Sequence, residues 1–202
     1  MRLTGVIFPV RVTALMKDEL EPIGCFDGVE VYPIPGYEGI YSISKCGKVW
    51  IHDRIVVRKG CGSFLKKGRW SHPSNAGAGY KSVMLTVGKP VRRYVHRLMV
   101  QTFLRPEGKF DVDHIDRNKH NNRIDNLRIA SKSNNQWNRG AQGGTSKFRG
   151  VTKTKSGKWA ARLMHKGRHL YLGVHETEKM AARARDEKAR ALHGDFVYLN
   201  LR

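Results

Sequence analysis

Short runs of apolar, β-type residues separated by glycine turns fill the first half of the chain. Between about Val29 and Tyr94 these runs are Ile40–Ser44, Lys48–Ile51, Lys81–Val87 and Val91–Val95. Runs of this length between turn-forming residues are typical of β-strands. The stretch from Gly60 to Gly79, with its many Gly, Lys, Ser and Asn residues, predicts a long loop or irregular connection.

The pattern changes near residue 95. A helix-like run covers Val95–Leu104, and a polar segment dense in Asp, His and Asn then continues to Trp137. The glycine-rich stretch 139–146 suits a flexible tether. We therefore expect a β-rich region over residues 1–94, a central unit over 95–138, a linker over 139–146 and a third unit over 147–202.

The third unit has the pattern of three strands followed by one helix. The predicted strands are Phe148–Thr152, Lys158–Met164 and His169–Val174, with hairpin turns at Ser156-Gly157 and Lys166-Gly167. The predicted helix is Glu178–His193, with Thr177 as its N-cap and Gly194 just after its end. Together with the first two units, this pattern predicts a multidomain α+β protein.

One side of that helix should face the sheet through small and apolar residues. The residues on this side are Met180, Ala181, Ala184, Ala191 and Leu192. Arg183, Arg185 and Lys188 are expected to lie mostly elsewhere on the helix.

The net charge of the chain indicates which kind of molecule it binds. The chain has 38 Lys and Arg against 17 Asp and Glu, a net charge of +21, which favours a polyanion. An anionic membrane is the weaker alternative, because no apolar run approaches the roughly 20 residues that span a bilayer. Arg11 interrupts the apolar stretch at Met1–Ala14, which lacks the pattern of a secretory signal. The sequence predicts a cytoplasmic protein that is not secreted and has no membrane partner.

The three cysteines point to neither a disulfide framework nor a zinc site. Cys25, Cys46 and Cys61 are widely spaced, odd in number and form no C-x-x-C pair. We expect reduced thiols and no zinc.

The residue types required for phosphodiester hydrolysis occur close together between residues 111 and 138. This reaction needs a base for water, a cation to neutralise developing charge and a rigid mount for both. The adjacent Asp113 and His114 offer a cation ligand and a base, and Asn126 and Asn135 offer hard amide oxygens. A helix starting in Ser131–Trp137 would bring Asn135 back toward Asp113. The alternative is a polar surface loop whose Asn and Asp residues form turns.

Residues from about Val95 to Trp137 closely resemble the HNH endonucleases, in the subclass found in phage and intron-encoded homing enzymes. The resemblance implies a β-hairpin and a helix around one divalent metal, expected to be Mg²⁺ with Mn²⁺ able to substitute. It implies that His114 is the general base and Asp113 the first metal ligand. Asn126 would fix the loop and orient the base. Asn135 would be the second ligand, where many members have His.

Three nearby polar residues receive other roles. His120 and Asn122 are expected to serve loop structure or DNA contact, and His96 to be structural or phosphate-facing.

Residues Ser146–Leu201 closely resemble the AP2/ERF DNA-binding domain. The matching pieces are Lys147–Val151 (KFRGV), Gly157–Ala161 (GKWAA), Tyr171–Gly173 (YLG), Ala181–Ala189 (AARARDEKA), Leu192–Asp195 (LHGD) and Leu199–Leu201 (LNL). The resemblance implies a three-stranded sheet that lies in the major groove of duplex DNA, with the helix packed behind it.

The expected DNA contacts of this sheet are Arg149, Lys153, Lys155, Trp159, Arg162, Arg168 and Tyr171. Arginine can read guanine with two hydrogen bonds, whereas lysine mostly binds phosphate. Trp159 could equally fill the core of the sheet. Many plant members carry an acidic residue where Arg162 stands, so their target sequence is not transferred to this chain.

Residues Val31–Arg54 are similar to the NUMOD4 motif, which precedes the nuclease in such enzymes. The pieces are Pro33–Gly39 (PIPGYEG), Tyr41–Ser44 (YSIS) and Gly47–Val49 (GKV). This resemblance implies a DNA-contacting module, and the alternative is a β-rich cap on the nuclease core.

The combined interpretation is a sequence-directed, homing-type endonuclease that acts on double-stranded DNA. One alternative is a non-catalytic AP2-type regulator that retains an HNH-like fold. A second alternative, supported by charge alone, is a protein that binds structured RNA. The target sequence, the number of strands cut and the oligomeric state are not predicted.

Overall fold

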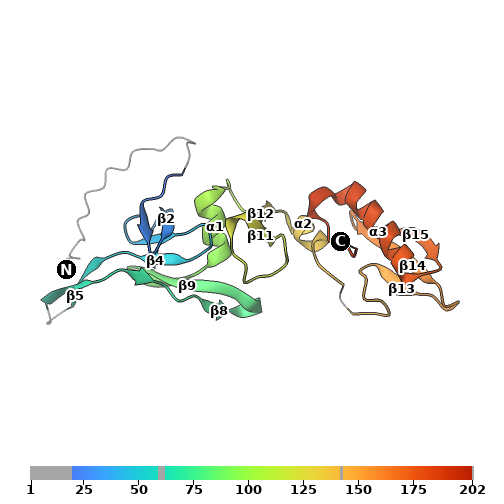
Figure 1. The fold of residues 1–202 in the computed structure, drawn as a ribbon, viewed down its shortest axis with the longest axis horizontal. Coiled ribbons are helices and arrows are strands. Elements are labelled where there is room, and N and C mark those ends of the chain that lie inside the picture. Colours follow the sequence, from blue (N-terminus) through green and yellow to red (C-terminus); the bar gives the residue numbers. More distant parts are fainter. Residues whose placement is uncertain (1–19, 59–61, 142, 202) are drawn as a thin grey trace.

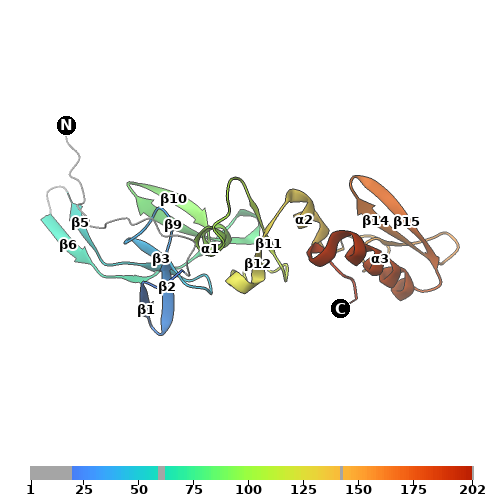
Figure 2. The same ribbon diagram turned by 90° about the horizontal axis from the view of Figure 1, so that it is seen from above.

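The computed structural model describes residues 20–58, 62–141 and 143–201, which form an elongated molecule (Figures 1 and 2). The β-rich N-terminal part lies at one end, the central unit in the middle and the C-terminal sheet at the other end. The expectations for Met1–Ala14 and for Cys61 fall outside the described residues. Cys25 and Cys46 are free and exposed.

The N-terminal part is made of antiparallel strands. One sheet has the order β1-β2-β3-β4-β7, with β1 at Gly24–Phe26, β2 at Val29–Pro33, β3 at Tyr41–Ile43, β4 at Val49–Ile51 and β7 at Arg69–Trp70. A second has the order β10-β9-β8, with β8 at Ser74–Ala76, β9 at Tyr80–Val87 and β10 at Lys89–Tyr94, and the 3₁₀ turn η1 at Gly77–Gly79. The hairpin of β5 (Arg54–Arg58) and β6 (Gly62–Lys66) projects from this end. The four predicted strands of this region are confirmed.

The prediction of a long loop between Gly60 and Gly79 was wrong for most of its length. Strands β6, β7 and β8 lie there, joined to neighbouring strands by backbone pairing. Every residue of β6 is exposed. A strand that buries neither face needs no apolar alternation, so a search for such alternation cannot find it.

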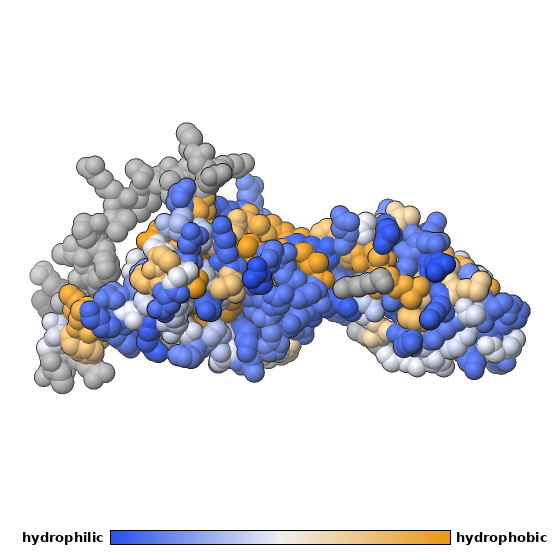
Figure 3. Space-filling model, viewed as in Figure 1, coloured by the Kyte–Doolittle hydropathy of each residue, from blue (hydrophilic) through white to orange (hydrophobic). Residues whose placement is uncertain are grey.

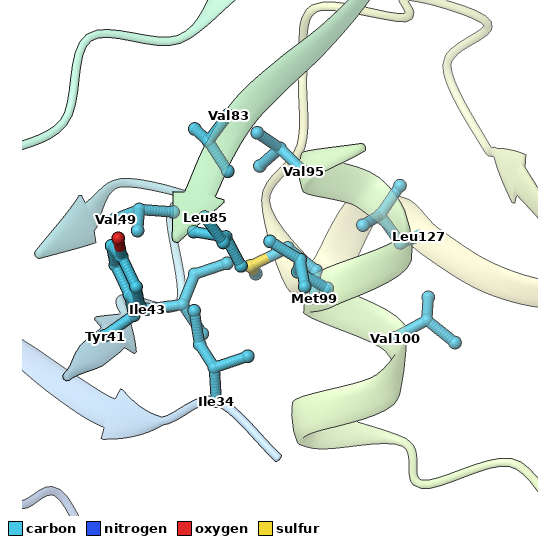
Figure 4. Close-up of a cluster of buried hydrophobic side chains, with 11 residues drawn as sticks. Ile34, Tyr41, Ile43, Val49, Val83, Leu85, Val95, Met99, Val100 and Leu127 are labelled. Carbon is cyan, nitrogen blue, oxygen red and sulfur yellow. The ribbon is translucent and has the colours of Figure 1, made fainter. Parts of the chain in front are cut away.

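Helix α1 (Val95–Phe103) confirms the predicted helix and lies at the centre of the main core. Met99 is fully buried between strands of the N-terminal part and β12, as the close-up in Figure 4 shows. The core residues around it are Ile34, Tyr41, Ile43, Val49, Val83, Leu85, Val95, Leu98, Val100 and Leu127. The N-terminal strands and the central unit therefore share one hydrophobic core.

The central unit continues as a hairpin followed by a short helix. Strand β11 (Asp111–His114) pairs antiparallel with β12 (Leu127–Ala130), and a loop containing the 3₁₀ turn η2 (Ile124–Asn126) joins them. Helix α2 (Lys132–Trp137) begins after Ser131, whose hydroxyl accepts a hydrogen bond from the Asn134 amide at 3.1 Å. The predicted return of the chain toward Asp113 thus occurs at α2.

The C-terminal unit has the predicted three strands and one helix. Strands β13 (Val151–Lys153), β14 (Trp159–His165) and β15 (Arg168–His175) form one sheet, and α3 (Glu178–His193) packs on it. The Thr177 hydroxyl caps α3 by accepting from the Met180 amide at 3.2 Å. Gly194 ends the helix with a φ of 56° and starts the 3₁₀ turn η3 (Gly194–Phe196). Both predicted ends of the helix are confirmed.

The predicted buried face of α3 was partly wrong. Ala181 is buried as expected, but Met180 is 53% exposed, whereas Arg185 is only 1% exposed. The Arg185 guanidinium donates to Asp186 Oδ1 at 3.0 Å and to the Tyr198 carbonyl. A charge with such partners can be buried, and the apolar pattern alone cannot reveal it.

The surface is largely hydrophilic over the central and C-terminal parts in the view of Figure 3. An apolar exception is the β5–β6 hairpin, where Ile55 and Val57 are 70% and 74% exposed. Among the described residues, no helix is both long enough and apolar enough to cross a membrane.

Candidate functional site

Asp113 and His114 stand at the end of β11, beside a cavity of about 560 Å³. Asn135 and Asn138, from α2 and the residue after it, line the same cavity. Successive residues of a regular strand point to opposite faces, but here both residues border one space at the strand end. The fold thus brings together three of the predicted site residues: Asp113, His114 and Asn135.

The residue Asp113 is 7% exposed, and its carboxylate receives hydrogen bonds from two side chains. Arg128 donates to its Oδ2 through Nε at 2.9 Å and Nη2 at 2.7 Å. Asn138 Nδ2 lies 3.0 Å from both carboxylate oxygens and also donates to the His114 carbonyl at 2.9 Å. A carboxylate has about four acceptor positions, two on each oxygen. Oδ1, with one donor against three on Oδ2, therefore keeps acceptor capacity for a cation.

The His114 ring is oriented by Asn122. His114 Nε2 lies 3.2 Å from Asn122 Oδ1, while Asn122 Nδ2 donates to the His120 carbonyl at 3.3 Å. The second contact fixes which end of the carboxamide faces the ring, so Nε2 is the protonated nitrogen and Nδ1 is the acceptor. Burial lowers the pKa of His114 below its ordinary value, which keeps the imidazole neutral at pH 7.

His96 borders the base but does not line the cavity. Its ring centroid lies 5.5 Å from that of His114 and 4.7 Å from that of Tyr80. Burial, followed by the neighbouring His114, lowers the pKa of His96 to about 4, so its ring is neutral near pH 7. This placement agrees with the structural role expected for His96.

Asn126 holds the loop between the two strands of the hairpin. Its Oδ1 accepts from the Asp116 amide at 3.0 Å, and its Nδ2 donates to Asp116 Oδ1 at 2.9 Å and to the Asn121 carbonyl at 2.8 Å. The side-chain hydrogen bonds of Asn126 are thus with the loop, and the direct contact with the His114 ring comes from Asn122.

The donor set of the cavity fits a hard divalent cation. Asn135 lines the same cavity as Asp113, and its carboxamide makes no hydrogen bond within the described part of the chain, so its oxygen is available to a ligand. No cluster of three or more His, Cys, Asp or Glu suited to a metal occurs in residues 20–58, 62–141 and 143–201. A cation held by one carboxylate and one carboxamide would keep several water ligands, which is the ordinary state of Mg²⁺ in proteins.

Three functional contacts were not found from the sequence: Arg128 and Asn138 on Asp113, and Asn122 on His114. A signal for Arg128 exists, because β-hairpin pairing places it directly opposite Asp113 and opposite charges often face each other across strands. Asn138 follows Asn135 by three residues, the spacing of one helix face. Only the folded loop brings Asn122 to the ring.

Basic side chains surround the opening of the cavity. Arg117, Lys119 and Arg139 line it together with the acidic and amide residues. Such a rim attracts a phosphate backbone.

The C-terminal sheet presents two of its predicted DNA contacts side by side. Arg162 and Tyr171 face each other directly in the pairing of β14 with β15, and both are exposed. Ala161 and Leu163, which alternate with Arg162, are buried on the α3 side. Arg162 and Tyr171 therefore lie on the face away from the helix, beside a shallow depression of about 570 Å³. Lys153 and Arg168 are exposed as well, but they pair with Trp159 and His165, which contact the α3 side, and Lys155 lies in the turn between β13 and β14.

The other two predicted contacts are engaged inside the molecule. Trp159 is half-buried and packs against the core formed by Val151 and the α3 alanines. Arg149 Nη1 donates to the carbonyls of Trp137 at 2.6 Å and Arg139 at 2.5 Å. Desolvation, with smaller effects from Arg185 and Arg139, lowers the Arg149 pKa to about 10. Arg149 thus joins the C-terminal unit to the end of α2.

Comparison with known proteins identifies the family. Residues 93–137 match the sequence model of the HNH endonuclease family. An uncharacterized HNH endonuclease of Acanthamoeba polyphaga mimivirus is 30% identical over 149 residues, which cover 70% of this chain and 76% of that protein. APETALA2-like protein 2 of Oryza sativa subsp. indica is 46% identical over 59 residues, which are 28% of this chain and 14% of that protein.

A solved structure of DNA binding and cleavage by the HNH homing endonuclease I-HmuI is 32% identical and covers 53% of this chain and 55% of that one, with a TM-score of 0.41. The mimiviral relative is matched over most of its length, and the family match coincides with α1, the β11–β12 hairpin and α2. The chain therefore belongs to the HNH endonuclease family and is a DNA nuclease, a hydrolase.

Proposed function

We propose that this nuclease hydrolyses one strand of duplex DNA per site, with a single divalent metal and with His114 as general base. The observation that carries the proposal is the common cavity of Asp113, His114 and Asn135. It offers a carboxylate oxygen, a carboxamide oxygen and an unprotonated imidazole nitrogen to one phosphodiester.

Each residue has a defined part in this reaction. Asp113 and Asn135 hold the cation, with Mg²⁺ as the expected ion and Mn²⁺ as a substitute. The bound cation supplies stabilisation of the charge that develops on the phosphate and on the leaving oxygen. His114 Nδ1 accepts a proton from the attacking water, while Asn122 holds the opposite ring nitrogen in place. Asn126 keeps the intervening loop in the shape that this requires.

We further propose that the C-terminal unit is an AP2-type reader of the DNA major groove. The similarity of 59 residues to a plant APETALA2-like protein supports this, as does the exposed pair of Arg162 and Tyr171 on the open face of the sheet. Arginine on such a face can read a guanine or bind a phosphate. Lys153, Lys155 and Arg168 add sequence-independent attraction to the backbone.

Residues 31–54 are proposed to serve mainly as a β-rich cap of the nuclease. Val31, Ile34, Tyr41, Ile43 and Val49 of this NUMOD4-like segment are buried, and the last four belong to the same core as α1. We also propose homing-type activity. One nuclease centre joined to a separate reader would allow recognition of an extended DNA site, because linked modules raise each other's effective concentration.

The first test is nicking, in the presence of Mg²⁺, of supercoiled plasmids that carry a library of genomic fragments, with rates then measured on a fragment that the wild type cuts. His114→Ala should reduce the rate by about 10² to 10⁴-fold, the usual contribution of a general base. His72→Ala is the matched control, since its exposed ring lies outside the central unit and makes no hydrogen bond within the described residues, so its loss should leave the rate within about twofold. Equal rates for His114→Ala and the wild type would exclude His114 as the base. An inactive wild type with intact DNA binding would instead favour the non-catalytic regulator.

The metal requirement gives a second prediction. Chelation by EDTA should abolish nicking, and added Mg²⁺ should restore it. Asn135→Ala should raise the Mg²⁺ concentration for half-maximal rate by on the order of tenfold or more, because it removes one ligand. Asn134→Ala, one residue earlier on α2, is the control and should titrate like the wild type. An unchanged Mg²⁺ titration for Asn135→Ala contradicts its assignment as a ligand.

The reader proposal predicts a selective effect on DNA binding. Arg162→Ala should weaken binding to duplex DNA in EDTA by about 1–3 kcal/mol, which is roughly 5- to 150-fold in Kd. Arg183→Ala, which removes an arginine that is also exposed but lies on α3, should change Kd by less than twofold. Equal losses from both variants would mean that the sheet face contributes only general positive charge. Stronger competition by structured RNA than by duplex DNA would contradict a major-groove reader.

A further inference from the structure

The segment that follows α3, residues 194–198, lies against the nuclease centre. Tyr198 donates its backbone amide to the Trp137 carbonyl at 3.0 Å, and the Trp137 ring stacks on His193 with centroids 4.0 Å apart. Arg149 adds hydrogen bonds to the same end of α2. Figure 1 shows α2 next to the end of α3. The C-terminal unit is therefore docked on the nuclease, beyond the covalent link.

Two aromatic rings of this segment each make a cation–π contact with an arginine of the nuclease centre. The Arg128 guanidinium lies over the Phe196 ring at 4.0 Å, and the Arg117 guanidinium lies over the Tyr198 ring at 4.3 Å. Arg117 lines the cavity, and Arg128 binds the Asp113 carboxylate. Cation–π contacts of this kind strengthen when the cation is shielded from water.

Arg128 divides its donors between the two units. Nε and Nη2 bind Asp113, while Nη1 donates to the Asp195 carbonyl at 2.7 Å. The Arg128 side chain is 17% exposed and that of Asp113 is 9% exposed. The guanidinium is thus held by both units. The Phe196 ring and the Asp195 carbonyl of the C-terminal unit contact it, and the Asp113 carboxylate of the nuclease accepts its other hydrogen bonds.

We infer that Phe196 is a positioning residue of the nuclease: it holds Arg128, and Arg128 holds Asp113 through Oδ2, so that Oδ1 keeps acceptor capacity for a cation. The inference rests on the proposed role of Asp113 as a metal ligand. Without the ring and the Asp195 carbonyl, Arg128 gains freedom to turn to solvent, and the carboxylate loses its fixed orientation. The C-terminal unit therefore contributes to metal binding, in addition to its proposed contact with DNA. Partners that orient metal ligands typically change metal affinity by 10- to 100-fold.

The test measures Mn²⁺ binding to the full chain without DNA, by electron paramagnetic resonance of the free ion, and Kd for duplex DNA in EDTA. Phe196→Leu keeps an apolar side chain but removes the ring face. It should raise the Kd for Mn²⁺ on the order of tenfold while DNA binding in EDTA stays within about twofold. Arg128→Lys, which keeps the charge but cannot bridge the Asp113 carboxylate and the Asp195 carbonyl with one planar group, should show the same loss.

Val197→Ala is the matched control, because it trims a half-buried residue of the same segment and should leave Mn²⁺ binding unchanged. Circular dichroism checks that each variant is folded. Asp113→Asn distinguishes a failure of the proposed metal site from a failure of the positioning role of Phe196. If it abolishes Mn²⁺ binding and Phe196→Leu binds Mn²⁺ like the wild type, the inference is overturned and the metal site stands. If Asp113→Asn also binds like the wild type, the proposed metal site itself fails, and the inference with it.

Discussion

The Asp113 carboxylate is held by Arg128 across the hairpin and by Asn138 beyond α2, and the geometry of the nuclease centre depends on this restraint. Arg128 reaches it because β11 and β12 pair with these two residues opposite each other. Asn138 reaches it because α2 folds back over the hairpin, and the same amide also binds the His114 carbonyl. A carboxylate fixed in this way is pre-organised, so little orientation is lost when a cation binds.

The shared hydrophobic core explains how the hairpin itself is kept in place. Leu127 starts β12 and is buried in the same core as Met99 of α1 and strands of the N-terminal part. The backbone of the next residue, Arg128, is therefore held in place by this packing. The N-terminal strands thus support the site through packing, even where they are distant from the cavity.

The local structure was predicted well from the sequence where helix caps and glycine turns mark the ends of elements. The Thr177 cap and Gly194 defined α3, and the Ser156-Gly157 and Lys166-Gly167 turns defined its sheet. The predicted site residues Asp113, His114 and Asn135 share a cavity. The contacts of Asn122 and Phe196 were beyond prediction because they join residues across folded loops or separate units. Strand β6 and the buried Arg185 were missed because neither follows an apolar period.

The large positive charge is only partly available to DNA. Arg128, Arg149 and Arg185 are turned inward, where they bind a carboxylate or backbone carbonyls. Arg128 and Arg149 also connect the C-terminal unit to the nuclease. Arginine suits these positions because its planar group carries several donors and stays charged when desolvated. The basic residues that remain at the cavity rim and on the open sheet face are those expected to meet phosphate.

The most direct test of this account is anomalous diffraction from crystals of His114→Ala bound to duplex DNA and Mn²⁺. One manganese peak is expected in the cavity, about 2 Å from an oxygen of Asp113 and an oxygen of Asn135. A manganese ion bound at other residues, with Asp113 in contact only with Arg128 and Asn138, would contradict it.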